Sequence, residues 1–527
     1  MRKSLTCIAL SLLTVLIWRM PNQPQASGIA MPAGKLNSLS YAPYRAWQSP
    51  HSKAFPACSG IAADLRLIAG HADGIRTYSS VTGDCDLAAL AGQSGLKLWL
   101  GIWLSANPAD NAREMAAGIA EANAYPDTVT RVIVGNEVLL RRDLSVSDLT
   151  ADIDYVRARV RQPVAYADVP DFWRKFPQVA DHVSIVMIHF LPYWENHPLG
   201  VDAAIRHIAT VTDQFKALFP AKTVSIGEAG WPSRGRWREA AAPSRVNEAI
   251  FLRRFVAAAD QEHVDYNIIE AFDQPWKYED EGVAGANWGI WNAHRLQKFA
   301  LEGGVVEHPD WPWYALLGIV FSMILWGSVW FRACRLAVPA FMLGNGLALA
   351  CAGTLPMLYD NWLILDALIN LPLQAVFAFR IIARADAIAA GRALPAHVPA
   401  QASLAALRRG RLMFDYDTLW TLFLAGAAIF QILLVFDGRY RDAPMAVFIV
   451  PVLAALIRLW TRDWPLPVEW EDRLAANVLA AGALASTIVE GPANLAFLAW
   501  NIAAIVLALP VLAVQFRSRP GRGTPGV

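Results

Sequence analysis

The most constraining feature of the sequence is a series of long apolar runs that begins at Trp311 and continues towards the C-terminus. Most of these runs are near the roughly 20 residues that an α-helix needs to cross a bilayer. They predict an all-α transmembrane domain of about seven helices over residues 306–517, with the weakest signals in the short runs that start at Ala443 and Leu474. The predicted spans are 311–331, 336–357, 362–379, 418–436, 443–457, 474–489 and 494–516.

Positive charges lie unevenly beside these runs, and short cytoplasmic loops are where membrane proteins retain Lys and Arg. If the part before Trp311 is exported, seven spans leave only Arg439 and Arg441 in short outer loops and put the 518–527 tail inside. The sequence therefore predicts a multi-pass protein of the cell membrane, with the lipid bilayer as one of its partners.

Three polar side chains stand in or beside the predicted spans, where charged groups are costly. They are Asp366, Asn370 and Glu490. Two interpretations remain open: these groups line a polar path through the bundle, or they pack between helices and near the membrane interface.

The N-terminus has the layout of a secretory signal peptide or a short signal anchor, which we predict, with its linker, over residues 1–30. Arg2 and Lys3 precede an uncharged run from Ser4 to Trp18. The small residues that cleavage would need lie well beyond that run, which favours retention as an anchor. In both cases the following domain is exported.

The composition of the exported part excludes some classes of protein. The net charge of the whole chain is +1 and no run is strongly basic, so no nucleic-acid partner is expected. Cys58 and Cys85 are the only cysteines in this part, and an oxidising compartment favours a disulfide between them over two buried thiols. No spacing resembles a zinc site, and neither a metal nor another cofactor is expected.

Residues 31–305 alternate short β-prone runs with polar, helix-prone stretches, which is typical of βα units around a parallel sheet. Eight such repeats in this length predict an α/β fold, a (β/α)₈ barrel of the TIM type. No Gly-rich phosphate loop follows any run, which argues against a nucleotide-binding sheet. The predicted strands are 39–45, 74–79, 97–104, 131–138, 164–168, 184–193, 223–231 and 266–276.

Carboxylates and aromatic residues follow several of these runs, at the barrel face where active sites lie. Glu137 follows the fourth run and Glu228 lies near the end of the seventh, so the two face each other across the predicted mouth. Aromatic faces stack on sugar rings and carboxylates bind hydroxyls, so this face predicts a sugar-binding cleft. Glycoside hydrolysis with retention needs two carboxyl groups about 5–5.5 Å apart.

Three segments resemble glycoside hydrolase family 17, the β-1,3-glucanase family, and the similarity covers about residues 36–300. They are Gly135-Asn136-Glu137, Gly227-Glu228-Ala229-Gly230-Trp231-Pro232-Ser233 and Ile75-Arg76-Thr77-Tyr78. The resemblance implies a retaining mechanism in which Glu137 is the acid/base and Glu228 the nucleophile, and it places Tyr78 in the cleft.

Two further segments, His189–Glu195 and Glu270–Lys277, are similar to the bacterial membrane-bound branch of that family, described as β-(1,6)-glucan synthases or glucanosyltransferases. In that branch the exported side is the periplasm and the membrane is the inner membrane. The sixth and eighth strands depart from the plant pattern, which leaves cleavage mode and linkage open.

Further substrate-binding candidates lie beside the pair. Asn136 is suited to bind the sugar 2-hydroxyl, and Tyr193, Trp231 and Trp276 are candidate stacking platforms. For two further candidates, a structural role and a functional role are both possible interpretations. His189 either positions a carboxylate or hydroxyl or is a satisfied barrel histidine. Glu270 either orients the nucleophile or binds sugar, or forms a buried pair with an arginine.

These observations predict a retaining enzyme that hydrolyses or transglycosylates β-1,3-glucan at the periplasmic face, with β-1,6 linkage as one outcome of transfer. The alternative is a catalytically minor glucan-binding or export protein that acts through its transmembrane domain. A separate membrane glucan synthase is a further partner that the helices could contact.

Overall fold

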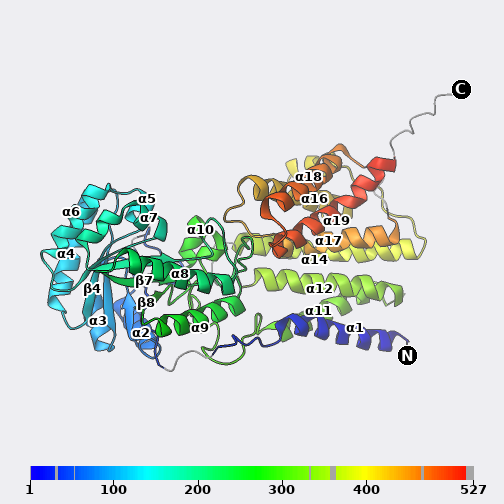
Figure 1. Ribbon diagram of the computed structural model, residues 1–527. Coiled ribbons are helices and arrows are strands. Elements are labelled where there is room, and N and C mark those ends of the chain that lie inside the picture. The colour runs from blue at the N-terminus through cyan, green and yellow to red at the C-terminus, as the bar shows by residue number, and fades with distance from the viewer. Residues whose placement is uncertain are drawn as a thin grey trace. The chain divides into compact units, whose positions relative to one another are not determined.

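The computed structural model describes residues 2–29, 34–52, 54–331, 334–356, 364–463 and 468–517. The chain divides into two compact units (Figure 1). One comprises Pro24–Val306, and the other combines Met1–Gln23 with Glu307–Val527.

The first unit is a closed barrel of eight parallel strands, in which each strand pairs with the next and β1 pairs with β8. The predicted (β/α)₈ barrel is confirmed, and every predicted run contains a strand. The strands are β1 (Leu39–Ser40), β2 (Gly74–Arg76), β3 (Lys97–Ile102), β4 (Val129–Asn136), β5 (Val164–Asp168), β6 (Ile185–Phe190), β7 (Thr223–Ala229) and β8 (Tyr266–Ile268).

Helices surround the strands, and Figure 1 shows them outside the sheet. They are α2 (Cys58–Ala69), α3 (Leu87–Gln93), α4 (Pro108–Ala124), α5 (Val138–Arg141), α6 (Val146–Arg157), α7 (Pro170–Lys175), α8 (Val201–Leu218), α9 (Arg245–Gln261) and α10 (Tyr278–Gly285). Local sequence explains their limits, because Asn107 and Ser244 accept backbone N–H groups at the starts of α4 and α9. The apolar stripe of α8 buries its side chains at helical spacing.

Cys58 and Cys85 form a disulfide that joins the start of α2 to the loop before α3, with their Cα atoms 5.5 Å apart. The bond closes a loop between cysteines 27 positions apart in the sequence. Restricting the unfolded chain by a loop of this length stabilises the folded state by about 3.5 kcal/mol.

We expect the Cys58→Ser/Cys85→Ser double variant to lose about 3.5 kcal/mol of barrel stability. Urea unfolding of the full chain in detergent, followed by tryptophan fluorescence, measures that loss. The wild type treated with a reductant provides the matched comparison. Equal urea midpoints for the oxidised wild type and the double variant would show that the bond has no role in stability.

The second unit is all α-helical, and the structure has a helix at each of the seven predicted C-terminal runs. Its helices are α1 (Arg2–Arg19), α11 (Trp311–Ser328), α12 (Ala337–Thr354), α14 (Ile364–Ala389), α15 (Ala400–Arg408), α16 (Tyr416–Phe436), α17 (Met445–Thr461), α18 (Trp470–Glu490) and α19 (Leu495–Arg517). Among the described residues seven helices, α1 included, are long and apolar enough to cross a membrane, whereas α17 is shorter. The 518–527 tail lies outside the described residues.

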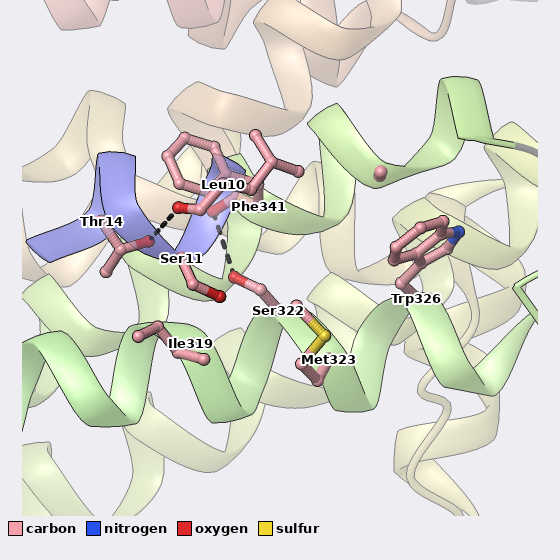
Figure 2. Close-up of a pocket in the computed structure, with 9 residues that line it drawn as sticks. Leu10, Ser11, Thr14, Ile319, Ser322, Met323, Trp326 and Phe341 are labelled. Carbon is pink, nitrogen blue, oxygen red and sulfur yellow. Dashed lines mark hydrogen bonds between the residues drawn. The ribbon is translucent and has the colours of Figure 1, made fainter. Parts of the chain in front are cut away.

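The N-terminal helix α1 packs within this unit through polar as well as apolar contacts. Trp18 Nε1 donates to Asn345 Oδ1 at 3.2 Å, and Asn345 Nδ2 donates to Thr14 Oγ1 at 3.2 Å. Figure 2 shows a small pocket between α1, α11 and α12, lined by side chains that include Leu10, Thr14 and Phe341. Its lining carries no charged group, so it is no candidate for catalysis.

The polar residues singled out in the spans have structural partners where they are described. Pro451 interrupts α17 and has no N–H to donate to the Val447 carbonyl, which instead accepts from Asn370 Nδ2 at 3.3 Å. Glu490 accepts from Asn494 Nδ2 at 2.8 Å. These bonds favour packing between helices over a polar path. The side chain of Asp366 lies outside the described residues.

Candidate active site

Irregular register brings the side chains of β6 and β7 together at the barrel mouth. Ile188 pairs with Ile226, but the next pair is His189 with Glu228, so the register skips Gly227. Because strand side chains alternate between faces, this skip moves Glu228 away from the face of Ile226 and onto the face of His189. Gly227 has no side chain to obstruct this, and a Cβ there would lie 2.9 Å from His189 Cδ2.

Arg76, at the end of β2, is the central cation of the site and is fully buried. Its Nη1 donates to Glu228 Oε1 at 2.9 Å and to the Gly227 carbonyl at 2.8 Å. Its Nη2 donates to Asn136 Oδ1 at 2.5 Å. One guanidinium therefore supplies the counter-charge of Glu228 and fixes the amide of Asn136, which leaves the Asn136 amide nitrogen as the donor available to a ligand.

Glu137 follows β4 directly and adopts a left-handed backbone conformation with φ of 52°. His189 Nδ1 lies 2.8 Å from Glu137 Oε1, and His189 Nε2 lies 3.3 Å from Arg76 Nη1. A guanidinium can only donate, so Nε2 accepts and the proton resides on Nδ1, which donates to Glu137. His189 thus connects the two glutamates as a neutral imidazole, the positioning interpretation of this residue.

The Glu137 carboxyl is held in its charged form. Burial acts to raise its pKa, but the hydrogen bond from His189 and the nearby cations Arg141 and Arg76 act to lower it and outweigh burial. The pKa of Glu137 therefore lies below its ordinary value. About 21% of its side chain remains exposed, so a ligand in the mouth can reach it.

The two carboxylates lie close together. One atom from each of Glu137, His189 and Glu228 falls within 4.8 Å of the other two, which is also the spacing of a metal-ligand set. The Arg76 guanidinium, however, already contacts Glu228 Oε1 at 2.9 Å and His189 Nε2 at 3.3 Å, so a metal bound to these atoms would lie beside a fixed positive charge. The donors are therefore part of an ion-pair network, and they do not fit a metal.

Tyr78 contributes a neutral phenol to the same mouth. Its hydroxyl donates to Ser40 Oγ at 3.0 Å, and the Arg76 guanidinium lies 4.9 Å from its ring centre. Burial and the nearby charge of Glu228 raise its pKa well above the ordinary value. The ring is half-buried, and its exposed part can contact a sugar.

Glu270 forms a buried pair with Lys277, so the predicted arginine partner is wrong. Lys277 lies beyond the loop that follows β8. Both Glu270 and Lys277 are close enough to Glu228 to interact electrostatically with its carboxylate. Burial raises the pKa of Glu270 to about 7, although Lys277 acts in the opposite direction. Glu281, from α10, is a third carboxylate beside Lys277, and burial raises its pKa as well.

Two predicted stacking platforms are wrong because their rings lie in the core. Tyr193 is 0% exposed and its hydroxyl donates to the Arg236 carbonyl at 2.6 Å. Trp231 is 1% exposed and its Nε1 donates to the Ala242 carbonyl at 3.0 Å. Tyr193 and Trp231 lie in the loops that follow β6 and β7, and their rings are buried there. Trp276 is half-buried, with Nε1 bound to Gln274 Oε1 at 2.9 Å, and it keeps a ring edge at the surface.

Sequence reasoning missed Arg76, Lys277 and Glu281. Arg76 and Lys277 stand inside the segments that resemble family 17, and a charged residue within a predicted barrel strand was the available signal for Arg76. Glu281 had no comparable signal, because it lies in a run of acidic residues on an expected helix.

A closed parallel barrel with two adjacent glutamates at the ends of β4 and β7 is the arrangement that retaining glycoside hydrolases use. Comparison with known proteins identifies the family. Residues 38–289 match the family model described as the BtgE/BtgC glycoside hydrolase domain. The barrel of this chain matches a glycoside hydrolase domain and is similar to family 17 proteins, so the predicted resemblance to that family is confirmed.

Individual relatives match the chain over about half of its length. The glucan 1,3-beta-glucosidase BGL2 of Candida albicans is 26% identical over 268 residues, which are 45% of this chain and 85% of that protein. The probable family 17 glucosidase SCW4 of Saccharomyces cerevisiae is 23% identical over 263 residues, 49% of this chain and 66% of that protein. A solved family 17 beta-1,3-glucanosyltransferase from Rhizomucor miehei is 26% identical and covers 51% of this chain and 98% of that one, with a TM-score of 0.45.

Proposed function

We propose that the chain is a retaining β-glucan-processing enzyme in which Glu228 is the nucleophile and Glu137 the acid/base. The observation that carries this proposal is the short separation of the two carboxylates, within 4.8 Å at their nearest ligand atoms. Retaining enzymes hold the pair about 5–5.5 Å apart, whereas inverting enzymes leave about 6.5–9.5 Å for a water molecule.

The two glutamates differ in exposure and in their charged neighbours. Glu228 is buried, and its charge is balanced by Arg76, so a carboxylate oxygen can attack the anomeric carbon while the glycosidic C–O bond breaks. Glu137 is partly exposed and gives its proton to the departing oxygen. In the second step Glu137 takes a proton from water or from a sugar hydroxyl, whose oxygen displaces Glu228 from the anomeric carbon.

The substrate class follows from the relatives. Proteins named as glucan 1,3-beta-glucosidases align with this chain over 79–85% of their own length in several fungi. We infer that the barrel acts on β-1,3-glucan. Transfer to a glucan hydroxyl, including formation of β-1,6 linkages, is the finer reaction that we propose beside hydrolysis.

The location that we propose is the periplasmic face of a bacterial inner membrane. Two observations support it: the apolar helices of the second unit, and a disulfide in the barrel, which forms in an oxidising compartment. We further propose that α1 is retained as an anchor and that the helices contact a membrane glucan synthase. The Trp18–Asn345–Thr14 hydrogen bonds support retention, because they join α1 to the rest of the helical unit.

The test is incubation of the detergent-solubilised full chain with laminari-oligosaccharides of one length. Mass spectrometry measures product length and NMR measures linkage. Products longer than the input establish transfer, and products that are only shorter establish hydrolysis. If neither forms, or if the Glu228→Gln variant forms the same products, the proposed function is wrong.

The pH dependence follows from the lowered pKa of Glu137. The first step needs protonated Glu137, so the alkaline limb of kcat/KM is set by that pKa and lies at acid pH. His189→Ala removes a hydrogen bond that stabilises the charged carboxyl, which raises the pKa of Glu137, so the limb moves to higher pH.

His189→Asn is the matched control, because its amide can still donate to Glu137 and should move the limb less. The measurement is kcat/KM for laminaripentaose between pH 3 and pH 8. A limb at the same pH in wild type and His189→Ala would contradict the role given to His189.

A further inference from the structure

The backbone that carries Glu137 is held in an unusual conformation. Gly135, Glu137 and Arg142 all have positive φ, at 86°, 52° and 61°. For the two residues with side chains this left-handed region costs roughly 1–2 kcal/mol each. Such a turn persists only where its surroundings impose it.

Strand β5 supplies much of what holds this turn. The Glu137 N–H donates to the Ala167 carbonyl at 2.8 Å, and the Leu139 N–H donates to the Tyr166 hydroxyl at 3.1 Å. The Tyr166 ring also lies against the Gly135 backbone, where an added Cβ would approach Tyr166 Cε2 to 3.3 Å. Tyr166 therefore contacts the segment on both sides of Glu137.

The Tyr166 hydroxyl is itself fixed. It donates to Asp168 Oδ2, and the other carboxylate oxygen of Asp168 accepts from the Val169 N–H at 2.8 Å. Trp173 packs edge-on against the Tyr166 ring, with their centres 5.4 Å apart. Tyr166 and Asp168 are 1% and 0% exposed, so neither can touch a substrate in the cleft.

We propose that Tyr166 and Asp168 are positioning residues for Glu137. Asp168 orients the Tyr166 hydroxyl so that its lone pair receives the Leu139 N–H, and this bond fixes the turn from which the Glu137 carboxyl reaches the glycosidic oxygen. The inference rests on the acid/base role proposed for Glu137. It adds that two buried residues of the neighbouring strand β5 hold the Glu137 carboxyl in the position from which it acts.

The test uses Tyr166→Phe in the full chain, with two substrates that differ in their need for acid. Laminaripentaose needs a proton on its leaving oxygen, whereas the dinitrophenolate of 2,4-dinitrophenyl β-laminaribioside leaves without one. A displaced acid should lower kcat/KM for laminaripentaose at least about tenfold, since an error of about 1 Å in placement costs on the order of 10²-fold. The value for the dinitrophenyl substrate should stay within about twofold of wild type.

Tyr266→Phe is the matched control. The Tyr266 hydroxyl also accepts a backbone N–H, from Asn37 at 3.3 Å. Tyr266, however, belongs to β8, and this bond lies away from the turn that carries Glu137. It should leave both kcat/KM values near wild type. Asp168→Asn is a second variant, in which the side chain at 168 loses its charge and one of the two oxygens that can accept a hydrogen bond. It should show the same selective loss to a smaller extent.

Equal losses on the two substrates in Tyr166→Phe and Asp168→Asn, or no loss in either, would overturn the positioning role. If wild type processes neither substrate, the proposed function fails, and the positioning role fails with it. If wild type turns over both substrates, the proposed function stands, and the variants then test the positioning role alone.

Discussion

Replacing Glu228 with Gln is expected to lower the turnover of laminari-oligosaccharides by roughly 10⁴-fold or more, because an amide cannot form the glycosyl-enzyme. The change keeps the size of the side chain, and the remaining oxygen can still accept from Arg76 Nη1. Initial rates of product formation by the full chain, measured by chromatography, give the loss directly.

The matched control for that variant is Glu195→Gln. Glu195 is partly exposed and lies 3.6 Å from His207, away from the Arg76 network, so this variant should retain wild-type rates. Residual activity of Glu228→Gln above about one hundredth of wild type would argue that another group attacks the anomeric carbon.

Replacing Glu137 with Gln is expected to lower kcat/KM for laminaripentaose by about 10²–10⁴-fold, the usual contribution of a general acid. The dinitrophenyl substrate should retain near wild-type kcat/KM, because its leaving group needs no proton. Its slow second step should be accelerated by added azide, which attacks the glycosyl-enzyme without a general base.

Azide acceleration with formation of a β-glycosyl azide would identify Glu137 as acid/base and the mechanism as retaining. An equal loss of kcat/KM on both substrates, with no azide product, would instead give Glu137 a binding or structural role. Wild type with azide, and Glu195→Gln with azide, provide the background rates.

The barrel could be predicted from the sequence because eight β-prone runs separated by helix-prone stretches leave few alternatives. The carboxylate pair could be predicted because Glu137 and Glu228 each follow or end an apolar run. The geometry that makes them adjacent could not. Strand alternation alone would put Glu228 on the face of Ile226, and only the skipped pairing at Gly227 reverses this.

Errors in strand length explain the other differences. The second run was predicted to continue to residue 79, which placed Arg76 in the middle of a strand, whereas β2 ends at Arg76 and its buried guanidinium binds Glu228 and Asn136. The sixth and seventh runs were predicted to end at Tyr193 and Trp231, but β6 and β7 end earlier, at Phe190 and Ala229. The two aromatic residues therefore belong to loops that cover the core.

The contribution of β5 is hidden in the sequence for a different reason. Tyr166 and Asp168 lie two positions apart on a strand, where side chains on the same face are expected, yet nothing local shows that the Tyr166 hydroxyl binds Leu139. That bond depends on the left-handed turn at Glu137, which is imposed by tertiary contacts. Long-range hydrogen bonds of this kind have no local sequence pattern.

The most direct test of the catalytic pair is capture of the covalent intermediate. The full chain is incubated with 2,4-dinitrophenyl 2-deoxy-2-fluoro-β-laminaribioside, whose fluorine slows both steps while its leaving group allows the first. Intact mass and peptide mapping then locate the sugar. We expect a single fluoroglycosyl adduct on the peptide that contains Glu228, and no such adduct in Glu228→Gln. An adduct on another carboxylate, or turnover of the substrate without any adduct, would contradict it.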